Sequence, residues 1–317
     1  AISVGHFDQI DRAIRDYSKA IENNIQFTEA YNNRGLAYAK KGELEKALTD
    51  YSAAIRADSR TGAAYYNRGI IYEYQEQNEL AISDFTRAVR LNPRNADAFF
   101  NRGNLFYNRG DHELAIMDYS KVVKLNPKHA QAFYNRGIAR SDSNKYKLAV
   151  QDFSRTIKLR PDHAQAYNNR GFAYTNTDLI DPAIKDFSKA IKIDSRYAEA
   201  YNNRGVAYAK QDKHDMAIKD YTRAIDIDEG NSEAYYNRAI ANQEISEFTS
   251  ALEDYSMAIA VDPEYAKAFS NRGYLRVIVN NDITGGCNDW RLACLLGECK
   301  NYNNGKKRGD CFEPPPK

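Results

Sequence analysis

Apolar residues along this chain fall into short helical runs that are separated by polar turns. Within each run the apolar positions recur every three or four residues over about 13 residues, which indicates an amphipathic helix. Polar tripeptides such as Lys41-Gly42-Glu43 separate the two runs of each pair. Prolines end the second run of several pairs, at Pro93, Pro127, Pro161 and Pro263. The pattern therefore predicts a chain of helical hairpins.

The hairpins repeat with a constant period of 34 residues. The tripeptide Asn-Arg-Gly occurs seven times, and a variant, Asn237-Arg238-Ala239, occupies the remaining register. Counting the glycine as position 8 defines eight repeats, which start at Thr28, Gly62, Ala96, Ala130, Ala164, Ala198, Ser232 and Ala266. Position 4 is aromatic in all eight, while position 20 is alanine and position 24 is tyrosine or phenylalanine in seven. Such units bury a continuous core only when they stack on one another.

This pattern of aromatic, glycine, alanine and proline positions resembles the tetratricopeptide repeat over nearly the whole chain. The resemblance implies an all-α fold, a right-handed superhelical solenoid of antiparallel helix hairpins with a concave inner surface. We expect residues 1–27 to form a partial repeat that contains the second helix alone. Residues 28–265 are then seven repeats, residues 266–300 an eighth, irregular capping repeat, and residues 301–317 a tail with one cysteine and three prolines. Glycine at position 8 lets the two helices of a hairpin approach closely.

Two charged columns do not vary among the seven complete hairpins, namely arginine at position 7 and aspartate at position 23. Both residue types are costly to bury without a partner. We therefore predict structural ion pairs that join each position-7 arginine to the position-23 aspartate of the preceding hairpin. The first of these pairs are Arg68 with Asp50, Arg102 with Asp84, and Arg136 with Asp118. The alternative is that the arginines bind a ligand directly.

Asparagine occupies position 6 of every repeat, at Asn33, Asn67, Asn101, Asn135, Asn169, Asn203, Asn237 and Asn271. Asparagine is a mediocre helix former, so an unbroken column requires a reason. If the first helix of each hairpin lines the concave surface, these amides offer a donor and an acceptor to an extended peptide backbone. Other superhelical tetratricopeptide arrays, including that of the glycosyltransferase that attaches N-acetylglucosamine to proteins, resemble this one in having such a ladder. The alternative is that each asparagine bonds the neighbouring helix and sets the pitch of the solenoid.

The remaining positions expected to face the groove are 2, 5, 9, 12 and 13, and we expect them to set specificity. The second to fourth repeats place aromatic side chains there, at Tyr66, Tyr74, Phe100, Tyr107 and Tyr134, and binding energy tends to concentrate on such residues. Position 2 is mostly acidic or amide, which favours a basic or neutral ligand. Some tetratricopeptide domains clamp the C-terminal carboxylate of chaperones. That clamp is absent here, because no repeat has lysine at position 5 or arginine at position 6.

Composition and charge narrow the class of protein. The chain has 317 residues, of which 43% are hydrophobic, and its 45 basic residues nearly balance 43 acidic ones, for a formal charge of +2. That balance argues against a dedicated nucleic-acid binder. Arginine and aromatic columns also suit the stacking of single-stranded nucleic acid, but the acidic side chains at position 2 oppose it, and we expect no nucleic-acid partner. No nucleophile–base pair, phosphate loop, metal signature or membrane-length apolar run is found. We expect no enzyme activity, no cofactor and no metal site.

The four cysteines lie together near the C-terminus, at Cys287, Cys294, Cys299 and Cys311. The segment from residue 287 to residue 297 resembles a closing segment of repeat proteins that bacteria export. The resemblance implies two disulfides that staple the terminal cap, with three pairings open, and favours an exported or periplasmic location. The alternative is four reduced thiols in a cytoplasmic cap.

The last repeat departs from the pattern through a one-residue insertion near Gly285-Gly286. Trp290 then takes the place of the position-24 aromatic, and we assign it to the core rather than to a ligand site. The tail after Lys300 contains the basic run Lys306-Lys307-Arg308 and three prolines, 314–316, just before its last residue. We expect this tail to be mobile or to extend as polyproline II.

Together these features predict a non-catalytic scaffold for protein–protein interaction. Its concave groove would bind an extended peptide or a disordered segment of another protein. The alternative is an architectural array that self-associates as a homo-oligomer through the apolar edge that the partial repeat, residues 1–27, leaves open.

Overall fold

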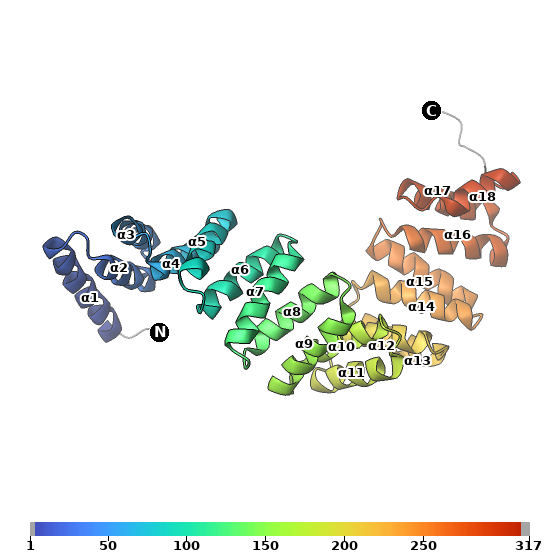
Figure 1. Ribbon diagram of the computed structural model, residues 1–317. Coiled ribbons are helices and arrows are strands. Elements are labelled where there is room, and N and C mark those ends of the chain that lie inside the picture. Colours follow the sequence, from blue (N-terminus) through green and yellow to red (C-terminus); the bar gives the residue numbers. More distant parts are fainter. Residues whose placement is uncertain (1–3, 312–317) are drawn as a thin grey trace, which may run out of the picture. The chain divides into compact units, whose positions relative to one another are not determined.

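The computed structural model describes residues 4–311, and in this part of the chain α-helices are joined by short turns, without strands (Figure 1). The chain divides into two compact units, and the division falls between Leu159 and Arg160. The first unit contains α1 (Val4–Asn23), α2 (Thr28–Lys41), α3 (Leu44–Ala57), α4 (Gly62–Tyr74), α5 (Asn78–Leu91), α6 (Ala96–Asn108), α7 (His112–Leu125), α8 (Ala130–Asp142) and α9 (Tyr146–Leu159).

The second unit contains α10 (Ala164–Thr175), α11 (Ile180–Ile193), α12 (Ala198–Ala209), α13 (His214–Ile227), α14 (Ser232–Glu244), α15 (Phe248–Val261), α16 (Ala266–Asn280), α17 (Ile283–Leu295) and α18 (Lys300–Arg308). From α2 onward, each even-numbered helix up to α16 pairs with the helix that follows it into a hairpin. Within each unit, the second helix of one hairpin packs against the first helix of the next. The all-α repeat fold predicted from the 34-residue period is thereby confirmed.

The turn inside each complete hairpin has one recurring backbone feature. Position 15 adopts a left-handed conformation with positive φ in all seven, at Gly42, Glu76, Gly110, Asn144, Asp178, Asp212 and Ser246. Only two of these residues are glycines, which adopt positive φ without a steric penalty. Because the other five also keep this conformation, the closely packed helices on either side determine the turn.

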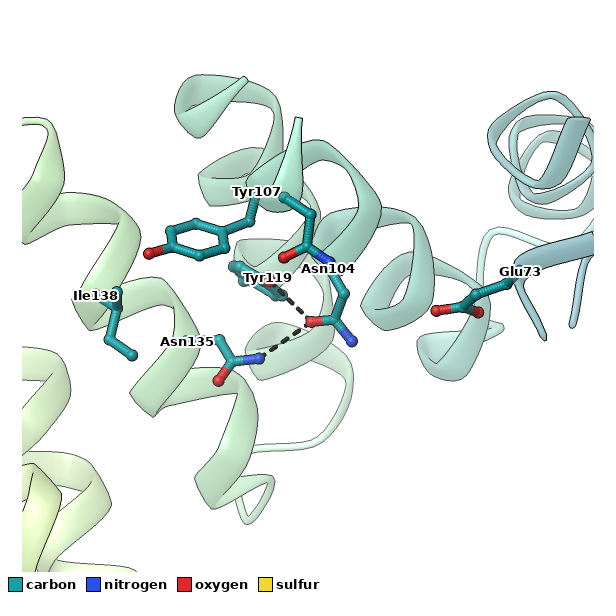
Figure 2. A pocket seen from close by; sticks show the side chains of 7 residues that line it. Glu73, Asn104, Tyr107, Tyr119, Asn135 and Ile138 are labelled. Carbon is teal, nitrogen blue, oxygen red and sulfur yellow. Dashed lines mark hydrogen bonds between the residues drawn. The ribbon is translucent and has the colours of Figure 1, made fainter. Parts of the chain in front are cut away.

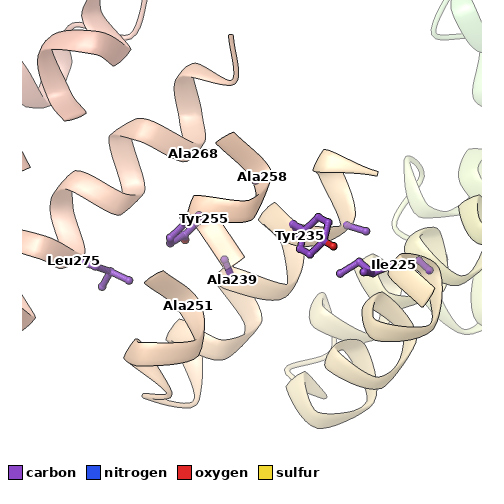
Figure 3. Packing of buried hydrophobic residues seen from close by; sticks show 10 residues of the cluster. Ile225, Tyr235, Ala239, Ala251, Tyr255, Ala258, Ala268 and Leu275 are labelled. Carbon is purple, nitrogen blue, oxygen red and sulfur yellow. The ribbon is translucent and has the colours of Figure 1, made fainter. Parts of the chain in front are cut away.

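Position 8 confirms the expected close approach of the two helices. A Cβ added to Gly137 would lie 2.7 Å from the ring of Phe153, which is the position-24 residue of the same hairpin. Six of the eight repeats have this glycine under a tyrosine or phenylalanine ring. In the repeat that begins at Ser232, Ala239 takes its place and packs in a buried cluster with Tyr255 and Ala251 (Figure 3).

The arginine and aspartate columns form ion pairs, but the predicted partners were wrong. Arg68 donates from Nε and Nη2 to both carboxylate oxygens of Asp84, at 2.7 and 2.9 Å, and not to Asp50 of the preceding hairpin. Position 15 lies midway between positions 7 and 23, so antiparallel helices bring these two positions opposite each other. The remaining pairs are Arg34–Asp50, Arg102–Asp118, Arg136–Asp152, Arg170–Asp186, Arg204–Asp220, Arg238–Asp254 and Arg272–Asp289.

The same guanidinium also reaches the preceding hairpin, through a hydroxyl group. Nη1 of Arg68 donates to Oγ of Ser52 at 3.0 Å, and Nη1 of Arg102 donates to Oγ1 of Thr86 at 3.0 Å. Position 25 supplies this serine or threonine. We call this unit of arginine, aspartate and preceding hydroxyl the clasp. It holds the two helices of a hairpin together and ties that hairpin to the one before it.

The C-terminal end is closed by two disulfides, Cys287–Cys311 and Cys294–Cys299, which are compatible with an oxidising compartment. Trp290 is 3% exposed, and its indole nitrogen donates to the carbonyl oxygen of Ser270 at 3.1 Å. It belongs to a cluster with Tyr302 and Cys311. The assignment of this tryptophan to the core is confirmed.

The expectation of a mobile tail was wrong for residues 300–308, which form α18. This helix packs on α17, and its Gly305 lies so close to Trp290 and Cys311 that a Cβ there would meet the Cys311 sulfur at 2.6 Å. The disulfide to Cys287 explains why a basic, weakly apolar segment is held in place. The three terminal prolines lie outside the described residues.

Candidate functional site

The position-6 asparagines lie on the first helices of the hairpins, and several of them bond the first helix of the hairpin before them. Each of four donates from Nδ2 to an asparagine Oδ1 of the preceding hairpin, at 3.0–3.1 Å. These bonds are Asn67 to Asn32, Asn135 to Asn104, Asn203 to Asn168, and Asn237 to Asn202. These four asparagines therefore have the inter-hairpin role that we gave as the alternative.

Where position 5 of the preceding hairpin is tyrosine, its hydroxyl becomes the acceptor. Asn271 donates to the Tyr236 hydroxyl at 3.2 Å. Burial raises the pKa of Tyr66, and a hydrogen bond from Asn101 opposes that shift. An amide has two N–H donors and two acceptor lone pairs. One bond to a neighbour therefore orients the amide and leaves part of its capacity for a ligand.

The repeat with phenylalanine at position 5 shows how strict this arrangement is. Phe100 has no hydroxyl to accept from Asn135, and position 9 of the same helix is Asn104. Its Oδ1 accepts from Asn135 at 3.0 Å and from the Tyr119 hydroxyl at 2.8 Å (Figure 2). An amide at position 9 thus replaces the acceptor that position 5 lacks.

The five predicted aromatic groove residues lie in different environments. Tyr66, Phe100 and Tyr134 are half-buried, and each ring lies about 6 Å from the position-24 ring of its own hairpin. They therefore contribute to packing as well as to the surface. Tyr74 is 76% exposed, and Tyr107 lines a hollow.

That hollow, of about 380 Å³, lies on the surface of three successive first helices, α4, α6 and α8 (Figure 2). We call it the Glu73 hollow. It is lined by Glu73, Asn104, Tyr107, Asn108, Tyr119, Asn135 and Ile138. The carboxylate of Glu73 points toward Asn104 from α4, opposite the ring of Tyr107 (Figure 2).

Burial dominates the titration of the groups in this hollow. It raises the pKa of Glu73 above its ordinary value. Burial, together with a hydrogen bond to Asp142, raises the pKa of Tyr107 to about 12, and the Tyr107 hydroxyl donates to Oδ2 of Asp142 at 2.7 Å. Burial also raises the pKa of Tyr119. At neutral pH the hollow therefore contains neutral phenols beside a carboxylate in an unfavourable environment.

A second hollow, of about 430 Å³, occupies equivalent repeat positions in the second unit. We call it the Lys210 hollow. It is lined by Val206, Ala209, Lys210, Asp212, His214, Tyr221, Asn237, Ile240, Ala241 and Glu244. Both hollows use positions 9, 12 and 13 of one first helix, the position-24 tyrosine beneath it, and positions 6 and 9 of the next. Their chemistry differs, because the Lys210 hollow is more apolar and contains a lysine beside two carboxylates, Asp212 and Glu244.

Glu73 and Asn108 were missing from the predicted site, although positions 12 and 13 were assigned to the groove. One signal was present: Glu73 is the only charged residue at position 12, where other repeats have alanine, tyrosine, serine, threonine, glutamine or valine.

Among residues 4–311, no cluster of histidine, cysteine and carboxylate side chains is arranged to hold a metal ion. None of the helices described there has the length and apolar character needed to span a bilayer.

Models of the tetratricopeptide repeat family match this chain in several places. The matches described as tetratricopeptide repeat cover residues 17–49, 66–130, 134–195 and 198–231, and one described as TPR repeat covers residues 35–75 and 180–212. The chain belongs to the tetratricopeptide repeat family, whose fold is a scaffold for protein–protein interaction and is generally non-catalytic. Among curated proteins, none matches the chain.

Solved structures with the same fold include several tetratricopeptide repeat proteins. YrrB, described as a TPR protein with an unusual peptide-binding site, is 28% identical, with a TM-score of 0.56 over 62% of this chain and 97% of its own. A tetratricopeptide repeat protein from Parabacteroides merdae is 22% identical, with a TM-score of 0.54 over 78% and 98% of the two chains. MamA from Desulfovibrio magneticus is 23% identical, with a TM-score of 0.51 over 54% and 96%. The last two share the fold alone.

Proposed function

We propose that this chain is a non-catalytic scaffold whose first helices form a groove that holds an extended peptide segment of another protein. The observation that carries this proposal is the column of position-6 amides, oriented by hydrogen bonds to the preceding first helix. A side chain that is already fixed loses little conformational entropy when a ligand binds. The column would therefore bind the main chain of a peptide with little dependence on its sequence.

Two further observations support a peptide as the ligand. The hollows beside the column in each unit are about 380 and 430 Å³, within the size range of ligand pockets, and they lie beside the amides at Asn135 and Asn237. In addition, YrrB, which has the same fold and is 28% identical, is described as having a peptide-binding site. The aromatic residues Tyr74 and Tyr107 would contribute contact area next to the ladder.

The proposal is tested with 12-residue peptides selected on the intact protein from a random library. A groove variant combines Asn67→Ala, Asn101→Ala and Asn135→Ala. The control variant combines Thr49→Ala, Asn78→Ala and Gln151→Ala, which remove exposed polar groups from second helices. Three lost hydrogen bonds of about 1 kcal/mol each should weaken peptide binding about 100-fold in the groove variant, as measured by calorimetry. The control should stay within twofold of the wild type, and equal losses in both variants would contradict the proposal.

A second candidate function, self-association through the edge formed by α1, rests on the exposure of that helix. Its Ala13, Tyr17 and Ala20 are partly exposed, whereas their counterparts in α3, such as Ala47 and Tyr51, are at most 1% exposed. A second copy of the chain is one way to cover this face. Light scattering over a range of concentrations decides the matter, and a monomer at every concentration would exclude self-association.

The disulfides lead to an inference about location. We infer that the chain works in an exported or periplasmic setting, because disulfides persist in oxidising compartments. Counting titratable thiols in protein from its native compartment tests this, with none expected in the denatured, unreduced protein. Four free thiols would contradict it.

A further inference from the structure

We propose that the Glu73 hollow receives an arginine side chain of the bound peptide. The inference rests on the proposed function, since it names the ligand chemistry of one part of the same groove. Three features carry it: an unpaired carboxylate, an aromatic wall with acceptors beside it, and the charge of the surrounding surface.

Glu73 is a half-buried carboxylate without a partner. Within the described part of the chain, no ion pair or hydrogen bond joins its side chain to another residue. Two other glutamates of the first unit, Glu79 and Glu113, pair with Arg109 and Lys145. Burial without compensation disfavours the ionised form and raises the pKa of Glu73. A ligand cation beside this carboxylate would remove the penalty.

The walls of the hollow match a guanidinium group better than an ammonium group. A guanidinium is planar, carries five N–H donors and no acceptor, and stacks on aromatic faces. The Tyr107 ring offers such a face, and its hydroxyl is already bonded to Asp142. The two carboxylate oxygens of Glu73 can accept two parallel N–H hydrogen bonds from one guanidinium. The amide oxygen of Asn108 is a further acceptor. A lysine side chain would supply the positive charge, but it could neither form the bidentate hydrogen bonds with the carboxylate nor stack on the tyrosine ring.

The surrounding surface of the first unit is acidic at the groove positions of its first helices. Carboxylates occupy these positions at Glu29, Glu73, Asp97 and Asp142, against one cation, Lys40. The equivalent hollow in the second unit contains Lys210 beside two carboxylates, Asp212 and Glu244. At the groove positions of that unit as a whole, two lysines offset three glutamates. The first unit therefore has the larger acidic excess, and charge complementarity directs a basic side chain there.

The direct test uses N-acetyl-arginine methylamide and its neutral isostere, N-acetyl-citrulline methylamide, titrated into the whole protein and followed by NMR. We expect the arginine compound to shift the Asn104 and Asn135 side-chain amide signals saturably at millimolar concentration. The citrulline compound should bind at least fivefold more weakly. In Glu73→Gln the two compounds should come within twofold of each other, whereas Glu113→Gln, an exposed change of the same kind on α7, should behave like the wild type. Equal binding of both compounds to the wild type would overturn the inference.

A second arm separates this inference from the proposed function. In peptides selected on the wild type, replacing one arginine by citrulline should weaken binding about tenfold in the wild type and less than twofold in Glu73→Gln. If the peptides depend on the asparagine column but not on arginine, the inference fails and the groove proposal stands. If no selected peptide loses affinity in the triple asparagine variant while the arginine compound still binds at Glu73, the groove proposal fails and the inference about the Glu73 hollow is upheld.

Discussion

The two units share one hairpin design but differ in the surfaces and ends that they present. The first unit has a hollow with the unpaired carboxylate of Glu73 beside Tyr107, and the second has a more apolar hollow in which Lys210 lies beside Asp212 and Glu244. The first unit begins with the incompletely covered helix α1, whereas the second ends under α18 and two disulfides. The clasps, in contrast, occur in both units with the same atoms. Residues that hold the hairpins together are thus constant, and the diversity is concentrated on the first helices.

The largest effect is expected from breaking one clasp in the first unit. Asp118→Ala leaves the mostly buried guanidinium of Arg102 without its bidentate partner, and unpaired buried charges cost about 3–5 kcal/mol. Urea unfolding should show a loss of that size. The control Asp142→Ala removes an exposed acceptor at the rim of the Glu73 hollow and should cost less than 1 kcal/mol. Equal losses would mean that the clasp has no special role.

Removing the disulfides at the C-terminal end is expected to cause the next largest loss of stability, and this loss should be confined to the second unit. Loop-closure entropy predicts about 3.5 kcal/mol for the Cys287–Cys311 bridge, with its separation of 24 residues, and about 2 kcal/mol for Cys294–Cys299, with a separation of 5. Replacing each pair by serine and measuring native-state hydrogen exchange would compare them. Faster exchange in α16–α18 with no change in α2–α9 is the expected result. A uniform change across both units would contradict the local role of the staple.

A smaller effect concerns the contact between positions 8 and 24. Gly137→Ala places a methyl group 2.7 Å from the Phe153 ring, and overpacking of this kind costs about 1–3 kcal/mol. The second unit already has alanine at this position, so Ala239→Gly should instead cost up to about 1 kcal/mol through lost helix propensity. Thermal unfolding of both variants tests the pair. A stabilised Gly137→Ala variant would show that the hairpin adjusts without strain.

The smallest effect is a gain in stability at the Glu73 hollow. The folded-state pKa of Glu73 is raised, so its ionisation penalty grows as the pH rises from its ordinary unfolded value through the folded value, and it is fully present above that. Glu73→Gln should therefore melt at a slightly higher temperature than the wild type at pH 7 and at the same temperature near pH 3. Glu113→Gln should show no such gain. A lower melting temperature for Glu73→Gln at pH 7 would mean that the carboxylate has a stabilising partner.

The sequence determined the helices and their stacking because each relevant position occurs many times. The periodic columns revealed the hairpins, the glycine beneath the position-24 ring and the place of Trp290 in the last repeat. They did not identify the partner of each arginine, since a constant column is equally consistent with Asp50 or Asp84 opposite Arg68. The symmetry of the antiparallel turn about position 15 decides between them.

Two of the features that sequence reasoning missed, helix α18 and the unpaired Glu73, occur once, so no repeated column reveals them. Helix α18 forms from a basic segment because Cys311 is bonded to Cys287, and the 34-residue pattern contains no such contact. The inter-hairpin bonds of the asparagines required positions 5 and 6 of adjacent repeats to be compared. Because these bonds exist, the triple asparagine variant should also lose some stability, about 1 kcal/mol for each residue. Glu73 differs from other glutamates by burial without a partner, which residue type alone does not show.

The measurement that tests this account most directly is a crystal structure of the whole protein with a peptide selected on it. We predict an extended peptide along the first helices, with main-chain amides bonded to Asn101 and Asn135 and an arginine side chain between Glu73 and Tyr107. A peptide bound as a helix, or bound to the second helices with the asparagine column untouched, would contradict the account.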